Sequence, residues 1–247
     1  MGKYSFENSI GGYSANYDKL LAKVLQEIDK EIFAIRSQID RMPDKDALPY
    51  LLANRKAVLD RLRAKTATAF NQATAGAYQA AFDASDSLFS DIRSAGVPFL
   101  TTDLEVFKLV RQGALDELAY HANQDGQELF NSLLQYNLTG NRNALDRSIA
   151  GNLDQLRVAK YGDTLVETNL MTFSRTINGV RAMNAGVDRF LYDGPGPDKI
   201  IRPFCAEHLG EEYTLDEING MDNGQTGDVF FTCGGFNCRH RWTPIQD

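Results

Sequence analysis

The sequence is poor in the residues that form disulfides and bind metals. Its 247 residues include only three cysteines, three histidines and one tryptophan. An odd number of cysteines argues against the disulfide framework of a small exported protein. No apolar run approaches the ~20 residues that a transmembrane helix needs, so we expect no membrane partner. The first residues also lack the apolar core of a signal peptide, which predicts a protein that stays in the cytoplasm after synthesis.

An excess of positive charge is also absent. The formal net charge is −7, and the balance is uneven along the chain. From Asp193 onward, ten acidic residues accompany four basic ones, whereas the first 192 residues are nearly neutral at −1. Domains that bind nucleic acid through their overall charge are basic. The composition therefore does not favour a DNA-binding protein, although a local DNA contact stays open as an alternative.

Residues before about 190 show helical rather than strand periodicity. Apolar side chains recur at alternating spacings of four and three, which predicts a coiled-coil seam of about three heptads. The seam consists of Leu21, Leu25, Ile28, Ile32, Ile35, Ile39 and Met42. Pro43 ends this helix. A second helix should start near Asp46, and the short connection favours an antiparallel hairpin. A seam of this kind also suits a homo-oligomer.

Further helices should follow the hairpin. The residues Thr102 to Glu105 form a capping box that opens one of them, and others are expected near 113–137, 141–160 and 162–185. The predicted helix breaks are Gly140, Gly151 and Gly162. We therefore expect a mainly α-helical protein. An elongated helical body should cover residues 15–192, after a flexible N-terminal arm over residues 1–14.

The sharpest change in composition lies at residues 193–198, DGPGPD, where two prolines and two glycines interrupt any helix. We expect a small α+β module over residues 193–247. In this module the residues Thr214 to Glu217 form a capping box for a short helix. The segments VFFTC and CRHRWTPI predict the two strands of a β-hairpin, with GGFN as the turn between them.

All three cysteines and two of the histidines lie in this module, in two clusters. Two residues separate Cys205 from His208. One residue separates Cys238 from His240, which places both on the same face of a strand. Zinc accepts thiolate and imidazole ligands in tetrahedral geometry, so we predict a structural zinc site with these four ligands. Cys233 either replaces one ligand or is a small buried residue. The alternative is a site without metal, with buried cysteines and hydrogen-bonded histidines.

Two arginines flank the second cluster. Arg239 and Arg241 alternate away from His240, and solvated charge is their expected role. A contact with DNA phosphate or an acidic partner is the weaker alternative. Trp242 is expected to fill the core of the module, which has few other large apolar side chains.

The C-terminal third resembles the C-terminal module of the Mu-type phage head morphogenesis family, also called minor head or minor capsid proteins. The resemblance is carried by the run YDGPGPDKIIRPFCAEHLGEEYTLDEINGMDNG…CGGFNCRHRWTP and covers roughly residues 163–247. In the family, a Cys pair follows a loop with Asp and Arg. A Gly and an aromatic residue come next, and an Asn-Cys-Arg-Cys or Asn-Cys-Arg-His run closes the module. Here Cys205 with His208, then Gly210 and Tyr213, and finally the run 237–240 match these positions.

The sequence departs from the family pattern at several positions. Histidine replaces cysteine at two ligand positions, which zinc tolerates. Arg175 and Thr176 stand where the family often has Arg-Thr-Glu, but Ile177 replaces the glutamate, so no role is transferred to it. The resemblance implies a structural role in head morphogenesis or in genome packaging and delivery. The expected partners are the phage portal and the major capsid protein. The expected location is the virion, and the host cytoplasm during assembly.

The sequence predicts no enzyme, because paired carboxylates, a nucleophile elbow and a P-loop are not visible in it. An HNH-like metal-dependent nuclease is the alternative. Its chemistry needs a histidine general base and open metal positions, and His121, the only histidine outside the clusters, belongs to the helical body. A nucleic-acid-binding module, supported by Lys199 and Arg202 together with the two flanking arginines, is a further alternative. A nucleophilic cysteine ranks last, because no His–Asp partner is evident.

Overall fold

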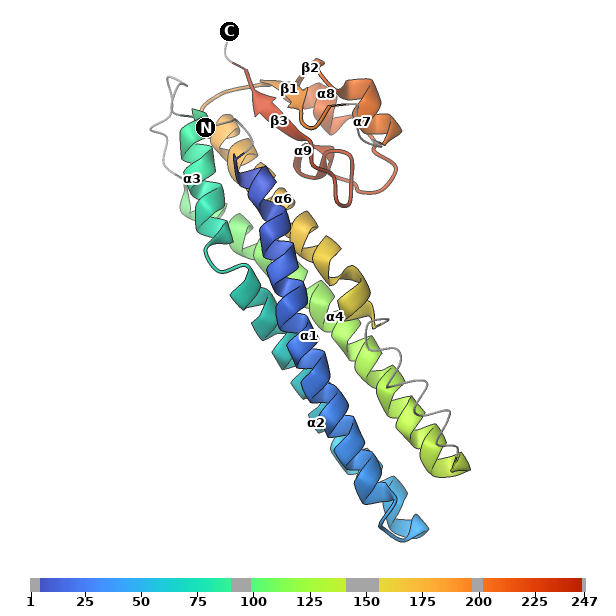
Figure 1. The fold of residues 1–247 in the computed structure, drawn as a ribbon. Helices are drawn as coiled ribbons and strands as arrows, with labels where there is room; N and C mark the ends of the chain where they lie inside the picture. Colours follow the sequence, from blue (N-terminus) through green and yellow to red (C-terminus); the bar gives the residue numbers. More distant parts are fainter. Residues whose placement is uncertain (1–4, 90–98, 141–155, 197–201, 246–247) are drawn as a thin grey trace. The chain divides into compact units, whose positions relative to one another are not determined.

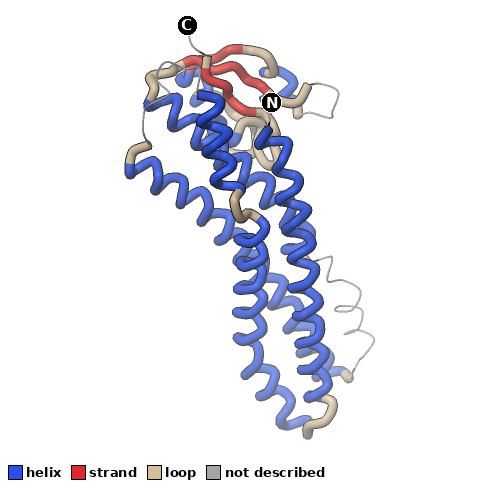
Figure 2. Tube along the Cα trace, turned by 60° about the vertical axis from the view of Figure 1, so that its left-hand side comes forward, coloured by secondary structure: helices blue, strands red, loops and turns tan. Residues whose placement is uncertain are grey.

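The computed structural model describes residues 5–89, 99–140, 156–196 and 202–245. These residues are mainly α-helical and include a small three-stranded sheet near the C-terminus (Figure 1, Figure 2). The predicted fold class is therefore confirmed. Among the described residues, no helix is both long enough and apolar enough to cross a membrane.

The chain divides into two compact units, which we describe separately. The first unit comprises residues 1–13, 75–113 and 164–247, and the second comprises residues 14–74 and 114–163. The long helices are α1 (Ser5–Ile39), α2 (Asp44–Ala73), α3 (Ala77–Phe89), α4 (Thr101–Thr139) and α6 (Arg157–Asn184).

The second unit contains the predicted helical hairpin. Six of the seven seam residues, Leu21 to Ile39, are at most 7% exposed, which confirms the apolar face read from the spacing. Ion pairs join Glu31 to Arg61 at 2.9 Å and Glu27 to Lys65. From Arg61 to Lys65 along α2, the partner on α1 changes from Glu31 to the earlier Glu27, so the two helices are antiparallel.

The start of α6 is capped by a side chain from another helix of the second unit. Asp125 on α4 accepts hydrogen bonds from the backbone N–H groups of Arg157 and Val158, both at 2.9 Å. These are the first two residues of α6, whose N–H groups have no partner within the helix. The Asp125 side chain is fully buried. Burial is the largest influence on the pKa of this carboxyl group and raises it.

Several helix boundaries differ from those predicted. Most of the expected flexible arm is helical, because α1 begins at Ser5 and buries Phe6 and Ile10. The predicted break at Gly162 is wrong, since this glycine lies inside α6. A Cβ atom there would lie 2.3 Å from the ring of Tyr17, so the helix needs glycine for close packing. Gly140, with φ +63°, does follow the end of α4.

Two further predictions concern residues after α4. The predicted break at Gly151 and most of the helix predicted over 141–160 lie outside the described residues. The capping box predicted at Thr102 is wrong, because α4 already begins at Thr101. The residue before the helix is Leu100, whose backbone N–H donates to the Asp103 carboxylate at 2.6 Å.

The sheet of the first unit has strand order β2-β1-β3 and is antiparallel throughout. Its strands are β1 (Arg189–Asp193), β2 (Glu212–Thr214) and β3 (Arg241–Pro244), and the short helices beside it are α7 (Pro203–His208), α8 (Leu215–Asn219) and α9 (Val229–Thr232). Figure 1 shows these elements gathered near the C-terminus. The central strand β1 ends at Asp193, where the composition changes. Residues on both sides of this point belong to the first unit, so the change does not mark a boundary between the two compact units.

The predicted hairpin of VFFTC and CRHRWTPI is wrong in detail. The first segment is helix α9, capped by the side chain of Asp228, which accepts from the Phe231 N–H. The second segment contains β3, but its partner is β1. A short apolar run does not distinguish a strand from a buried helical turn. The capping box at Thr214 and Glu217 is confirmed.

The core beneath the sheet is apolar and aromatic. Phe190 and Tyr192 of β1 point inward together with Trp242 of β3, and each is at most 4% exposed. The Trp242 indole N–H donates to the carbonyl oxygen of Val229 at 3.1 Å. Trp242 is therefore a core residue, as the sequence predicted. All three cysteines belong to this apolar core.

Candidate metal centre

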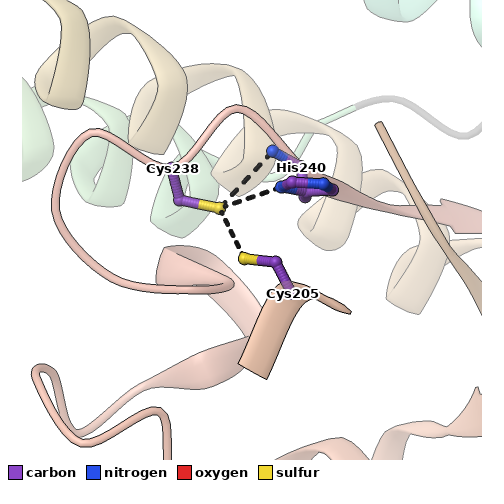
Figure 3. Close-up of side chains that lie close together, drawn as sticks. All are labelled: Cys205, Cys238 and His240. Carbon is purple, nitrogen blue, oxygen red and sulfur yellow. Dashed lines mark hydrogen bonds between the residues drawn. The ribbon is translucent and has the colours of Figure 1, made fainter. Parts of the chain in front are cut away.

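Three of the predicted ligands converge on one point. The ligand atoms of Cys205, Cys238 and His240 all lie within 4.8 Å of one another, and all three residues are buried (Figure 3). Cys238 Sγ lies 3.7 Å from Cys205 Sγ and 3.6 Å from His240 Nδ1. None of the three cysteines forms a disulfide. This cluster could hold a metal ion.

The separations fit the edges of a tetrahedral zinc site. With zinc–sulfur bonds of about 2.3 Å and zinc–nitrogen bonds of about 2.05 Å, tetrahedral angles give a sulfur–sulfur edge of about 3.8 Å and a sulfur–nitrogen edge of about 3.6 Å. The observed edges around Cys238 are 3.7 and 3.6 Å. An ion of this size could therefore be accommodated with little movement of these side chains.

A tight loop brings the two cysteines together. Cys205 lies in the first turn of α7, which starts at Pro203, and Cys238 follows the loop after α9. A Cβ atom on Gly234 would lie 2.2 Å from Cys205 Sγ and 3.2 Å from Cys238 Sγ. Only glycine leaves room for both sulfurs at this position.

The environment favours one thiolate and one thiol. Cys238 Sγ accepts hydrogen bonds from the backbone N–H groups of Gly234 at 3.3 Å and His240 at 3.4 Å. The contact with Cys205 is the main cause that lowers the pKa of Cys238, and the charge of Arg175 lowers it further. The same sulfur–sulfur contact, followed by burial, raises the pKa of Cys205.

One nitrogen of His240 is oriented for ligation. Its Nε2 lies 3.2 Å from the carbonyl oxygen of Pro195, and its Nδ1 faces Cys238. A ligating histidine usually donates its other N–H to a carbonyl or carboxylate, which fixes the ring and the tautomer. With Nε2 donating to Pro195, the lone pair on Nδ1 is free for a metal ion.

His208, the fourth predicted ligand, does not join this cluster in the structure. It lies on α7, three residues after Cys205, and its Nδ1 is 2.8 Å from the hydroxyl oxygen of Tyr213. The spacing in the sequence could not reveal this contact with β2. Because Nδ1 is engaged, Nε2 is the nitrogen left for a metal, and His208 stays a predicted ligand.

Cys233, the alternate ligand, is also outside the cluster. It is fully buried at the end of α9 with φ of 53°. Burial raises its pKa to about 12, so its side chain is a thiol at neutral pH. This placement agrees with the second role proposed from sequence, a small buried residue.

Arg175, which had no predicted role, supports the whole site. Its guanidinium donates to the backbone carbonyl oxygens of Cys238 at 2.6 Å, His240 at 2.9 Å and Thr232 at 3.2 Å. Arg175 lies on α6 and is 5% exposed. It therefore fixes the backbone of both ligand residues after α9. The one indication in the sequence that Arg175 has a role was its match to the arginine of the Arg-Thr-Glu run that is frequent in the family it resembles.

Two of the arginines considered for DNA binding, Arg239 and Arg202, have partners within the first unit, and a third, Arg241, is buried. Arg239 forms an ion pair with Glu167 at 2.9 Å. The expectation of solvated charge is wrong for Arg241, which is 5% exposed because it belongs to β3 beside the buried core. Arg202 donates to the carbonyl oxygens of Gly234, at 2.7 Å, and of Phe236.

Tyr192 is a second residue at the site that had no predicted role. Its hydroxyl oxygen lies 3.3 Å from Cys205 Sγ and 3.8 Å from Cys238 Sγ. Its ring is stacked on that of His240, with centroids 5.4 Å apart and an interplanar angle of 6°. Tyr192 therefore contacts all three residues of the cluster. Inward-facing aromatic residues at two-residue spacing in β1 were the available signal.

Comparisons with known proteins give no match to this chain, whether with protein-family models, with curated proteins or with solved structures.

Proposed function

We propose that this chain is a non-enzymatic, structural component of a tailed-phage particle, a minor head protein that acts in head morphogenesis or in genome packaging and delivery. The observation that carries the proposal is the convergence of Cys205, Cys238 and His240. These are three of the four positions that the resemblance to the phage head morphogenesis family marks as ligands. The proposed partners are the portal and the major capsid protein, and the proposed location is the virion.

The proposed metal is zinc in a structural role. Two thiolates and an imidazole are typical zinc ligands, and the backbone contacts of His240 and Cys238 supply the outer-shell support that such sites need. The three ligand residues are between 2% and 5% exposed, which leaves little access for a substrate. A site buried to this extent suits an ion that stabilises the fold rather than one that acts on a substrate.

The ion would join segments that are distant in the sequence. Cys205 on α7 and Cys238 are 33 residues apart, and the loop between them contains only short elements. A bound metal contributes its binding free energy to folding when the unfolded chain lacks the site. We propose that zinc stabilises this part of the first unit, while Arg175 anchors it to α6.

The nuclease and nucleic-acid alternatives receive little support. Arg239 is paired with Glu167, and Arg241 is buried. His121, the remaining candidate for a general base, belongs to the second unit and packs against the ring of Tyr161, with centroids 5.6 Å apart. The described residues therefore offer no specific observation in favour of either alternative.

Two measurements test the proposal. Elemental analysis of the purified protein should find about one zinc per chain. Mass spectrometry of purified particles should find the chain at a low, reproducible copy number per portal ring. Zinc without particle association would leave a metal-stabilised protein with another role. Particle association without zinc would retain the virion role and overturn the metal site.

A further inference from the structure

We infer that Tyr192 is the positioning residue of the metal site, because its hydroxyl donates a hydrogen bond to the Cys205 thiolate of the metal-bound protein while its ring orients the imidazole of His240. The inference rests on the proposed metal site and adds a residue outside the predicted ligand set. It also predicts which properties of the bound ion this residue controls.

The position of the Tyr192 hydroxyl supports this role. The hydroxyl oxygen is 3.3 Å from Cys205 Sγ, within hydrogen-bonding distance for sulfur, and the longer contact to Cys238 Sγ measures 3.8 Å. Tyr192 is fully buried. A buried hydroxyl without a partner is costly, and the two sulfurs are the partners that the structure provides.

Metal binding determines which atom donates. In the free protein either the phenol or a thiol could supply the hydrogen. Sulfur binds zinc as a thiolate, which has no hydrogen to donate. The phenol must therefore be the donor once Cys205 is a ligand. A hydrogen bond donated to a thiolate stabilises its negative charge. It therefore lowers the energy of the sulfur lone pairs and favours the metal-binding thiolate over the thiol that competes with the metal.

The strand and its neighbours hold Tyr192 in place. Its backbone N–H donates to Glu211 at 2.9 Å, and its carbonyl accepts from Gly210 at 2.9 Å. Its ring lies against Trp242, with centroids 4.5 Å apart, as well as against His240. The hydroxyl is therefore positioned by packing before any ion binds, as expected of a residue that orients ligands.

The test replaces only the hydroxyl. Tyr192→Phe keeps the ring, and Tyr78→Phe is the matched control, because the Tyr78 hydroxyl bonds to Asn169 at 2.9 Å in the same unit. The full-length proteins are loaded with Co²⁺ for absorption spectra and titrated with Zn²⁺ against a competing chelator. We expect Tyr192→Phe to shift the sulfur-to-cobalt charge-transfer band to lower energy. Its affinity for zinc should fall about 10–100-fold, and Tyr78→Phe should match the parent in both measurements.

A second measurement does not depend on a variant that folds. In the zinc-loaded parent, NMR should detect a slowly exchanging hydroxyl proton on Tyr192. A phenolate that coordinates zinc directly has no such proton, so its absence would overturn the inference. Unchanged spectra and affinity in a folded Tyr192→Phe protein would also overturn it. A parent protein that binds neither Co²⁺ nor Zn²⁺ would instead overturn the metal site, and the inference with it.

Discussion

Arg175 donates a 2.6 Å hydrogen bond to the carbonyl oxygen of Cys238, across 63 residues of sequence. Its other donors reach His240 and Thr232, so a single side chain of α6 holds the backbone on both sides of a ligand sulfur. Positions of this kind support a site without touching its ion.

Replacing Arg175 should destabilise the protein strongly. Arg175→Ala removes the donor to the carbonyl oxygens of Cys238 and His240 and one of the two donors to that of Thr232, which also accepts from the Gly235 N–H. We expect the free energy of unfolding to fall by about 3 kcal/mol or more. Arg175→Lys should recover only part of this loss, because one ammonium group cannot reproduce the geometry of the guanidinium. Arg239→Ala is the control, since Arg239 is half-exposed and loss of its ion pair with Glu167 should cost less than about 1 kcal/mol. Equal losses in chemical denaturation would contradict the prediction.

Removal of one ligand sulfur should remove the metal. Cys205→Ser and Cys238→Ser should each lose the bound zinc and the folded structure around the sheet. Most helical circular dichroism should remain, because the long helices lie elsewhere in the sequence. Cys233→Ser should keep about one zinc per chain, because Cys233 lies outside the cluster. Retention of zinc by the first two variants, or its loss from the third, would show that the ligand set is wrong.

His208 should act as the fourth ligand through Nε2, since its Nδ1 is held by Tyr213. We expect His208→Ala to weaken zinc binding by about 100-fold or more, as for the loss of a direct ligand rather than a supporting residue. His121→Ala, in the second unit, should bind zinc as the parent does. Competitive titration measures both affinities. Parental affinity in His208→Ala would leave Cys205, Cys238 and His240 as the protein ligands.

Zinc binding should release about one proton from the two ligand cysteines near neutral pH. The raised pKa of Cys205 keeps this group a thiol, while the lowered pKa of Cys238 makes it a thiolate before the metal arrives. Protons therefore compete with zinc at Cys205, and affinity should rise about tenfold per pH unit between about pH 7 and 8. Calorimetry in buffers of different ionisation enthalpy counts the protons. A release of two protons, or of none, would contradict this protonation pattern.

Asp125 should stabilise the second unit through α6. Asp125→Ala removes the acceptor of two backbone N–H groups, at a cost of about 1–3 kcal/mol. Burial raises the pKa of Asp125, so the folded state holds this proton more tightly than the unfolded state does. The parent should therefore lose stability as the pH rises above about 4, through the folded-state pKa. The Ala variant should lack this component, which denaturation curves across pH measure directly.

The features predicted successfully depend on local spacing. The seam from Leu21 to Ile39 was recognisable because a regular apolar repeat specifies a helical face wherever the helix packs. The convergence of Cys205, Cys238 and His240 could be anticipated because candidate ligands lie in close pairs in the sequence. The error over Val229–Thr232 arose where four residues carry too little periodicity to separate strand from helix.

The residues missed were those whose partners are distant in the chain. Nothing near Arg175 in the sequence indicates that its acceptors follow 57 to 65 residues later. Tyr192 reads locally as an inward residue of a strand, and only the fold places its hydroxyl beside Cys205. The same limit applies to His208, since its contact with Tyr213 depends on how β2 passes α7.

The space around Gly234 has a consequence for recognising this site in other chains. No side chain fits between the two sulfurs, so a chain that closes the same loop should keep glycine four residues before its second cysteine. Gly-x3-Cys-x-His, read from residues 234 to 240, is then a search pattern with a steric basis. Sequences that share the ligands but lack this glycine would need a different loop to bring them together.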